Sequence, residues 1–225
     1  GVVTTYTTTT PLKNTGKITL SGNDSVGMTY ETDNIGSGAA MENTGTIIAN
    51  GDRSIALYAK TPKTSGSYTT TNSGTITMGD SAKLATPNVA LYTDATKAGV
   101  TPLKNTGKIT VGNNALGIYG YESDNSGDIT VGKGGIGIYS QGGNINLTGG
   151  TIKTGEKSGN EESVGVYTVG NGQTVTNSGT AFDFGKDSFG FVNVGTSNKI
   201  YSNVASTSLK DNNVYIYSND TKGTV

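Results

Sequence analysis

The nonapeptide PLKNTGKIT occurs twice in the chain, at residues 11–19 and again at residues 102–110. Its central Asn-Thr-Gly belongs to a series of Asn-(Thr/Ser)-Gly triplets, and a diverged copy, TGGTIK, covers residues 148–153. The asparagines of the series are Asn14, Asn43, Asn72, Asn105, Asn125 and Asn177, and the glycines are Gly16, Gly45, Gly74, Gly107, Gly127, Gly150 and Gly179. These glycines recur every 20 to 33 residues. A period of this size indicates a repeat architecture in which each repeat is one supersecondary unit.

Each repeat contains three short strand-like segments. One follows the glycine, as in KITV (108–111), and a weaker one precedes the asparagine, as in PLKN (102–105). The third is the strongest, and it lies at 25–29, 54–58, 88–92, 115–119, 135–139, 163–167, 188–192 and 213–217. One coil of three strands cannot bury its apolar face, whereas stacked coils form a continuous core. We therefore expect an all-β fold, a right-handed parallel β-helix of about eight coils of three short strands.

We expect residues 1–225 to form a single β-helix segment. Residues 195–225 lose the Asn-Ser-Gly corner, so they are expected to form an irregular or diverged last coil. Both copies of the nonapeptide should then occupy the same side and corner of the coil, three coils apart.

The corner triplet has a structural interpretation. Glycine can close a corner with a positive φ at no steric cost, and asparagine bonds local backbone with its side-chain amide. If the asparagine side chains point inward, successive amides bond from coil to coil as a ladder.

The third segment alternates a large apolar residue, a small residue, a large apolar residue and usually tyrosine, as in ALGIY (115–119). Period-two alternation predicts one buried face. The two large columns should therefore point inward, and the small column should lie outside with the tyrosines. The outward tyrosines are Tyr58, Tyr92, Tyr119, Tyr139, Tyr167 and Tyr217. They form either a platform on which sugars stack or a shield over the sheet.

Segment lengths indicate a second candidate binding surface. Residues 30–40, 60–69 and 94–101 are insertions that should project from one edge of three consecutive coils, and they carry Lys60, Tyr68 and Lys97. Two further insertions, 79–88 and 155–163, belong to a different corner. Loops on a rigid scaffold often carry recognition, although surface insertions also accumulate neutrally because they cost little.

Composition narrows the function classes. The 225 residues include 35 glycines and no cysteine or histidine, and the formal net charge is −1. These values give no support for a nucleic-acid partner. No apolar run approaches the ~20 residues of a membrane span, so we expect no membrane contact by this segment. Disulfides, cysteine-ligated metals and serine–histidine triads are excluded, and we expect no cofactor. With no initiator Met and no signal peptide, the chain is expected to be a piece of a longer protein.

An enzyme is the rival class, because pectin-degrading lyases and hydrolases also use parallel β-helices. Lyases need basic residues beside a calcium-binding carboxylate cluster, and the hydrolases need convergent carboxylates. Here the one arginine, Arg53, follows a turn, and no strand carries paired carboxylates. Asp124 and Asp128 flank one corner and could hold a cation together with Glu122. We expect solvated turn carboxylates there and no enzymatic activity.

The repeats NTGKITVGNNALGIYG (105–120), NSGDITVGKGGIGIYS (125–140) and NSGTITMGDSAKLATPNVALYT (72–93) resemble the passenger-domain repeats of type V autotransporters, in particular giant fusobacterial-type adhesins. The resemblance covers residues 11–194. It implies a monomeric, extracellular β-helical passenger at the outer membrane of a Gram-negative bacterium. It also implies adhesion to a protein or glycan on a host cell or another bacterium. The motif marks scaffold positions and transfers no binding residue. A structural spacer without a ligand and a pectate-lyase-like enzyme are the alternatives.

Overall fold

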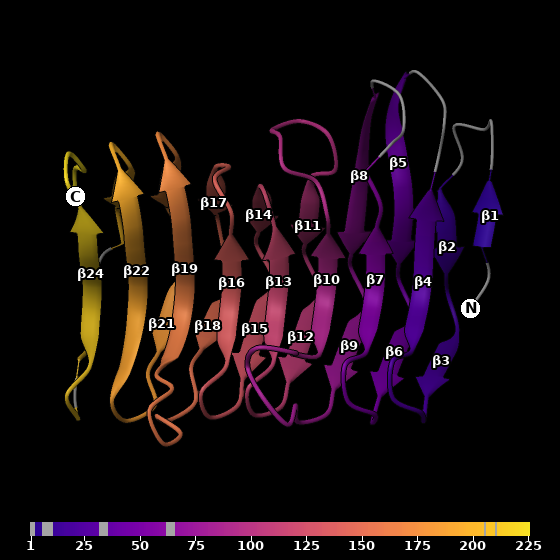
Figure 1. Cartoon of the computed structure of the whole chain (residues 1–225), viewed down its shortest axis with the longest axis horizontal. Coiled ribbons are helices and arrows are strands. Elements are labelled where there is room, and N and C mark those ends of the chain that lie inside the picture. The colour runs from indigo at the N-terminus through magenta and orange to yellow at the C-terminus, as the bar shows by residue number, and fades with distance from the viewer. Residues whose placement is uncertain (1–2, 6–10, 32–35, 62–65, 205, 210) are drawn as a thin grey trace.

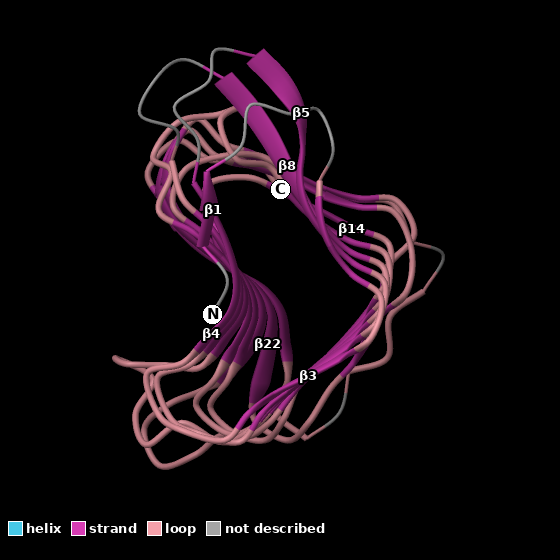
Figure 2. Ribbon diagram, turned by 90° about the vertical axis from the view of Figure 1, so that its right-hand side faces the viewer, coloured by secondary structure: helices cyan, strands magenta, loops and turns pink. Residues whose placement is uncertain are grey.

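The computed structural model describes residues 3–5, 11–31, 36–61, 66–204, 206–209 and 211–225. This described part is built from strands and contains no helix, and therefore no helix that could cross a membrane. Three parallel sheets wind around one axis as a right-handed solenoid of about eight coils (Figure 1). Figure 2 shows the coils end on, with the three sheets enclosing the interior. The prediction of a right-handed parallel β-helix is confirmed.

Each sheet takes one strand from each coil, so neighbours in a sheet come from successive coils. Sheet A contains β1 (Val3–Thr5), β4 (Val26–Glu31), β7 (Ile55–Ala59), β10 (Val89–Thr93), β13 (Leu116–Gly120), β16 (Ile136–Ser140), β19 (Ser163–Asn171), β22 (Ser188–Thr196) and β24 (Val214–Asp220). Sheet B contains β2 (Leu12–Asn14), β5 (Gly36–Asn43), β8 (Gly66–Asn72), β11 (Leu103–Asn105), β14 (Ser123–Asn125), β17 (Ile145–Leu147), β20 (Thr174–Asn177) and β23 (Lys199–Ser202). Sheet C contains β3 (Lys17–Leu20), β6 (Thr46–Ala49), β9 (Thr75–Met78), β12 (Lys108–Val111), β15 (Asp128–Val131), β18 (Thr151–Lys153) and β21 (Ala181–Asp183).

The two copies of the nonapeptide occupy equivalent places. The first spans β2 and β3 and the second spans β11 and β12, and the coils of β5–β6 and β8–β9 lie between them. The register keeps the corner asparagines aligned, since Asn105 lies opposite Asn72 on one side and Asn125 on the other. The repetition in sequence therefore reproduces one position of the coil, as expected.

The corner asparagines form the predicted ladder. The Nδ2 group of each donates to Oδ1 of the next, with donor–acceptor distances of 2.7 Å from Asn14 to Asn43 and 2.8 Å from Asn43 to Asn72. Two further bonds of 2.8 Å continue the ladder through Asn105 to Asn125. Leu147 takes the ladder position in the next coil, so the amide of Asn125 donates instead to the carbonyl of Gly127 at 2.9 Å.

Beyond Leu147 the asparagine returns but bonds locally. Asn177 lies opposite Leu147, and its Nδ2 group donates to the carbonyl of Thr180 at 3.1 Å. The ladder therefore needs asparagine in two consecutive coils, because a hydrocarbon side chain offers the amide neither a donor nor an acceptor.

The reason for the corner glycines differs from the prediction. Gly45, Gly74, Gly107, Gly127 and Gly179 do not have a positive φ; among the corner glycines only Gly150 does, at +70°. Instead, these glycines lie against the preceding coil. A Cβ on Gly107 would lie 2.2 Å from the carbonyl oxygen of Gly74, and one on Gly127 would lie 2.1 Å from that of Gly107. Glycine is required because stacked corners approach too closely for any side chain.

The inward and outward columns of sheet A also differ from the prediction. The small residue and the large residue after it both face the interior, so Ala90 and Leu91 are each 0% exposed. A Cβ on Gly117 would approach Cγ2 of Ile129 in sheet C to 3.0 Å. The same Cβ would lie only 2.5 Å from the carbonyl oxygen of Gly137 in the next coil, so both the adjacent strand of sheet A and sheet C keep this column small.

The first large column lies outside, with the tyrosines, in a separate hydrophobic cluster. Strict alternation fails because the strand pairing between coils skips the small residue: Val89 pairs with Leu116, and Leu91 pairs with Ile118. The strand thus places two consecutive residues inside, and an apolar residue remains on the outer face.

The last coil continues two of the three sheets. β23 pairs with β20, and β24 pairs with β22. Within the described residues, sheet C ends at β21. Residues 195–225 thus extend sheets A and B without a third strand.

The ladder generates a first prediction. Asn72→Ala removes one bond in each direction: the Asn105 acceptor loses its ladder donor, and Nδ2 of Asn43 keeps only its 3.4 Å bond to the carbonyl of Gly45. We expect a loss of about 2 kcal/mol of unfolding free energy. Thr71→Ala, on the adjacent partly exposed position of β8, should change it by less than about 0.5 kcal/mol. Urea denaturation compares the two, and equal effects would contradict the ladder.

The stacked corners generate a second prediction. Gly107→Ala places a methyl group against the backbone of the preceding coil, and this contact can be relieved only by separating the coils. We expect a loss of about 2 kcal/mol or more in unfolding free energy. Gly16→Ala is the matched control, because a Cβ there would meet no heavy atom within 4 Å. Thermal and urea unfolding should separate the two variants, and similar midpoints would refute the steric explanation.

Candidate functional site

The outer face of sheet A carries a continuous row of stacked phenol rings. We call Tyr58, Tyr92, Tyr119, Tyr139 and Tyr167 the tyrosine row. Neighbouring ring centroids lie 5.0 to 5.2 Å apart along the row. From Tyr92 to Tyr167 the planes are within 17° of parallel, whereas Tyr58 meets Tyr92 edge on at 65°. Parallel strands impose this spacing, because each ring is carried by the equivalent position of the next coil.

The stacking decides which part of each ring a ligand can reach. Because the rings use their faces to contact one another, no sugar can lie on a ring face within the row. The ring edges and hydroxyl groups are what the row presents to solvent. The Tyr58 hydroxyl donates to Oδ2 of Asp94 at 2.9 Å, and the amide of Gln141 donates to the hydroxyl of Tyr119. Of the two sequence-based alternatives, this geometry favours the shield over the sugar platform.

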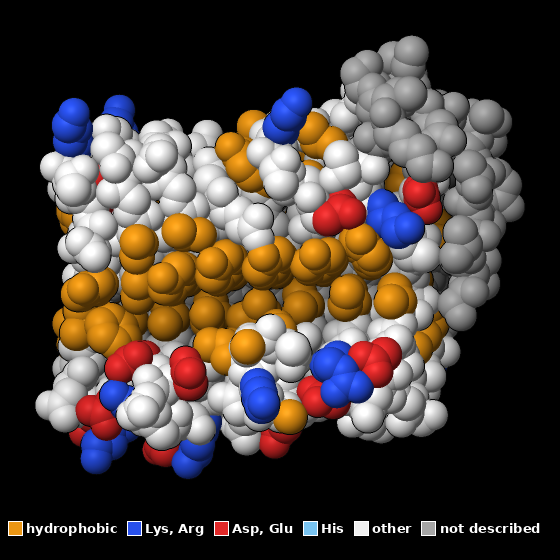
Figure 3. Space-filling view, in the orientation of Figure 1, with side chains coloured by type: hydrophobic (Ala, Val, Ile, Leu, Met, Phe, Trp, Pro, Cys, Tyr) orange, Lys and Arg blue, Asp and Glu red, His pale blue; other side chains and the backbone are white. Residues whose placement is uncertain are grey.

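A trough lies beside the tyrosine row. Its floor is the first large column, which we call the apolar row: Ile55, Val89, Leu116, Ile136, Val164 and Phe189. The four central side chains of the row are only 4% to 6% exposed. Two hollows of about 480 and 340 Å³ lie over this floor, with tyrosines on one side. Figure 3 shows the apolar and tyrosine side chains as one hydrophobic band along sheet A.

The insertion 79–88 forms part of the opposite wall of the trough. Asn88 fixes its base: Nδ2 donates to the carbonyls of Gly79 and Asp80 at 3.0 and 3.1 Å, and Oδ1 accepts from the backbone N–H of Ser54 at 2.7 Å. Its middle presents Leu84, Ala85 and Pro87 to the first hollow. No sequence-based prediction includes this trough. The large apolar residue Leu84 inside a polar insertion is the sequence signal that indicates it.

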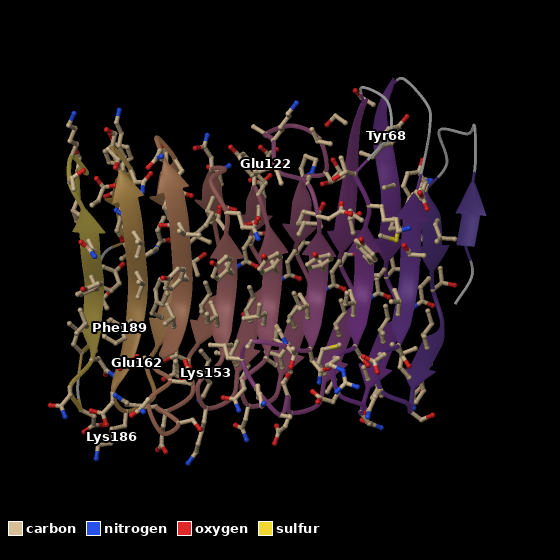
Figure 4. The ribbon with its side chains drawn as sticks, in the orientation of Figure 1. Tyr68, Glu122, Lys153, Glu162, Lys186 and Phe189 are labelled. Carbon is tan, nitrogen blue, oxygen red and sulfur yellow. The ribbon has the colours of Figure 1, made fainter. Side chains whose placement is uncertain are left out.

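Charged residues line the trough near its ends. Arg53 borders the first hollow, and Glu161 and Glu162 border the second. In Figure 4, Glu162 and Phe189 lie near the beginnings of β19 and β22. The guanidinium group of Arg53 donates to both carboxylate oxygens of Asp24 at 2.7 Å and to Asp52 at 3.4 Å. This pairing lowers the pKa of Asp24 and raises that of Arg53.

The predicted projecting loops do meet at one corner, where sheet A leads into sheet B. Residues 36–40 and 66–69 lengthen β5 and β8, and Gly36 pairs with Gly66. The N–H of Tyr68 donates to the carbonyl of Val100 at 2.9 Å, which brings the segment 94–101 alongside. Figures 1 and 2 show β5 and β8 extending beyond the body of the solenoid. Residues 32–35 and 62–65 of the predicted loops lie outside the described residues.

The three side chains predicted on these loops have different surroundings. Lys97 is exposed. Lys60 pairs with Glu31 at 3.0 Å, and its Nζ lies 6.0 Å from the ring centroid of Tyr58. Tyr68 is only 8% exposed, and its ring packs against that of Tyr30 with centroids 5.7 Å apart (Figure 4). The ring of Tyr68 therefore offers a ligand little surface.

The carboxylates considered as a cation site do not converge. Asp124 lies on β14 and accepts from Nδ2 of Asn146 at 2.7 Å, whereas Asp128 lies on β15 and accepts from the N–H of Thr151 at 2.9 Å. Within the described residues no three Asp, Glu, His or Cys side chains are grouped as metal ligands would be. Each carboxylate instead links its own coil to the next.

Burial raises the pKa of Tyr92, Tyr119 and Tyr139, and burial together with the bond to Asp94 raises that of Tyr58. The folded state therefore holds these phenol protons more tightly than the unfolded chain. Their contribution to stability is complete below the unfolded value of about 10 and is lost as pH rises through the raised pKa values.

This linkage generates a third prediction. Unfolding free energy, measured by urea denaturation between pH 8 and 11, should fall once the pH exceeds about 10. The triple variant Tyr92→Phe, Tyr119→Phe, Tyr139→Phe keeps the stacked rings but has no phenol to ionise there, so its fall should be shallower. Identical pH profiles for the two proteins would contradict the linkage.

The chain was also compared with known proteins. No protein-family model matches it, and no curated protein and no solved structure matches it either. The architecture and the geometry of its outer surfaces are therefore the basis on which a function is proposed.

Proposed function

We propose that this chain is a segment of a cell-surface adhesin of the autotransporter type. In this proposal the β-helix is a stiff spacer, and the corner between sheets A and B contacts the partner. The partner would be a protein or glycan on a host cell or another bacterium. The observation that carries the proposal is the unbroken stacking of coils, a fold that is compatible with a stalk or passenger domain.

Stiffness supports the spacer role. Each coil is tied to the next by strand pairing in sheets A and B, and in most coils by sheet C. Side chains add further links on two sides, through the asparagine ladder inside and the tyrosine row outside. Bending such a rod would open several of these contacts at once, so the segment would hold a binding surface at a fixed distance.

The projecting corner supports the adhesive role. β5 and β8 have 8 and 7 residues, whereas β11, the next strand of sheet B, has 3. Their extra length forms a paired arm beside the segment 94–101. Because the backbone of this arm is already paired, binding through it costs little conformational entropy, which favours recognition by this corner.

The autotransporter assignment rests on the resemblance of the repeats. It supports a proposed location on the outer surface of a Gram-negative bacterium, where an adhesin would meet its partner. A pectate-lyase-like activity and a spacer without a ligand are the competing functions, and the experiment below distinguishes all three.

A fourth prediction tests the adhesive corner. Beads coated with the chain should bind host or bacterial cells, and Lys97→Glu should reduce binding by about tenfold, because a reversed charge opposes a complementary partner. Lys104→Glu is the matched control, since it makes the same charge change on an exposed position of sheet B. It should bind as the unaltered chain does.

Each competing function has its own outcome. If no cell binds the coated beads, the segment acts as a spacer. If cells bind and neither variant alters binding, the contact does not lie at the Lys97 corner. New reducing or unsaturated ends after incubation with acidic polysaccharides and calcium would assign an enzymatic function.

A further inference from the structure

The tyrosine row holds the phenol rings of successive coils in contact. Between Tyr92 and Tyr119, between Tyr119 and Tyr139, and between Tyr139 and Tyr167, ring centroids lie 5.1 to 5.2 Å apart and ring planes are within 17° of parallel. The register fixes these neighbours, because each tyrosine pairs with the tyrosine of the next strand. Each of these rings therefore has another phenol beside it at a fixed distance.

The row has defined ends and a solvent-facing edge. Thr29 takes the equivalent position on β4, before Tyr58, and Val192 takes it on β22, after Tyr167. The five side chains are half-buried, so their edges and hydroxyl groups reach solvent while their faces are covered. Tyr201 on sheet B differs in both respects. It is 47% exposed, and none of the ring pairs in the described residues includes it.

Adjacent phenols are the arrangement that oxidative coupling requires. A one-electron oxidant removes an electron from a tyrosine and the hydroxyl proton passes to water, which leaves a phenoxyl radical with its unpaired electron on the oxygen and the ortho carbons. Two such radicals form one carbon–carbon bond between their ortho carbons. Each of these carbons then releases its hydrogen as a proton, and each oxygen takes one up. In net terms two electrons pass to the oxidant, two protons pass to water, and both phenols are restored.

The parallel strands bring the ortho carbons within reach of one another. Equivalent residues of neighbouring strands lie ~4.8 Å apart, and the torsion that turns a phenol ring about its Cβ–Cγ bond has a broad energy minimum. When two stacked rings turn edge to edge, their facing ortho carbons lie closer than the strand spacing. The hollows beside the row give the rings room to turn. Ring contact also lets an unpaired electron pass along the row until it meets a second one.

We propose that the tyrosine row is a site of oxidative modification, at which a one-electron oxidant forms dityrosine links between the stacked rings of Tyr92, Tyr119, Tyr139 and Tyr167. Each link ties one coil covalently to the next on the outer face of sheet A. A linked rod resists separation of its coils, because each closed loop lowers the entropy of the unfolded chain. The modification does not depend on adhesion, since it needs no partner and lies away from the projecting corner.

The test oxidises dilute chain with photo-activated ruthenium tris-bipyridine and persulfate, a small one-electron oxidising system. Persulfate accepts the two electrons of each link and becomes sulfate. We expect dityrosine fluorescence and, after trypsin digestion, linked peptides that join each stacked tyrosine to its neighbour. At least one lysine lies between each neighbouring pair in the sequence, so mass spectrometry identifies every link.

Tyr119→Phe breaks the row chemically while keeping a ring in the stack, because phenylalanine has no phenol to oxidise. This variant should lose both links that involve position 119 and keep the link between Tyr139 and Tyr167. Tyr201→Phe is the matched control, since it removes a more exposed phenol that lies outside the row. It should form the row links at the level of the unaltered chain.

The unfolded chain gives a second control. In urea the same tyrosines meet the oxidant but no longer lie in register, so the row links should fall to the level of links that involve Tyr201. Absence of dityrosine from the folded chain would overturn the proposal. Links at Tyr201 and Tyr217 as frequent as those within the row would also overturn it, because exposure alone would then select the rings. Linked peptides found only in covalent dimers would assign the coupling to collisions between chains instead.

Discussion

Registry between coils is the constraint on which the structure depends. Parallel strands place each residue about 4.8 Å from its equivalent in the next coil, so each side chain must pack against or bond to the side chain at the same position of the next coil. Asparagine suits this arrangement because its amide donates on one side and accepts on the other, and Asn72 does both. Isoleucine suits it through self-packing, as at Ile109 and Ile129. Leu147 packs in the core but cannot join the asparagine ladder, so apolar packing and ladder bonding are separate requirements at this position.

The same registry explains where the chain tolerates insertions. The corner between sheets B and C varies least in length: two residues join its strands from β2–β3 to β14–β15, and three join β17 to β18 and β20 to β21. Gly107 lies there against the backbone of Gly74, so a side chain would push the coils apart. The other two corners turn outward, and there a longer loop costs only closure entropy. Insertion 79–88 and the arms of β5 and β8 occupy these corners. Most of the variation in repeat length, from 20 to 33 residues, therefore falls in these two corners.

The sequence pattern predicted the features that depend on the registry between coils. It failed to predict which residues of sheet A face the interior. The asparagine ladder, the coil number and the three-strand coil follow from repetition alone. The inward position of Ala90 does not follow from repetition, because strict alternation assumes that successive residues face opposite sides, whereas Ala90 and Leu91 both lie in the core. The trough was missed for the same reason, since its floor is the column that alternation had placed inside. Tyr68 was predicted to lie on a projecting loop, but its ring packs against that of Tyr30, a contact that the sequence pattern does not indicate.

The outward position of the apolar row affects the surface of sheet A. An apolar residue on the outer face of a sheet would normally be unfavourable in water, and the tyrosine row removes most of that cost by covering Val89 and its equivalents. The cover is incomplete because each ring stacks along the axis and leaves a slot beside the row. Each further coil of this kind would lengthen the slot by one strand spacing, so the repetition that stabilises the rod also extends the apolar surface beside the tyrosine row.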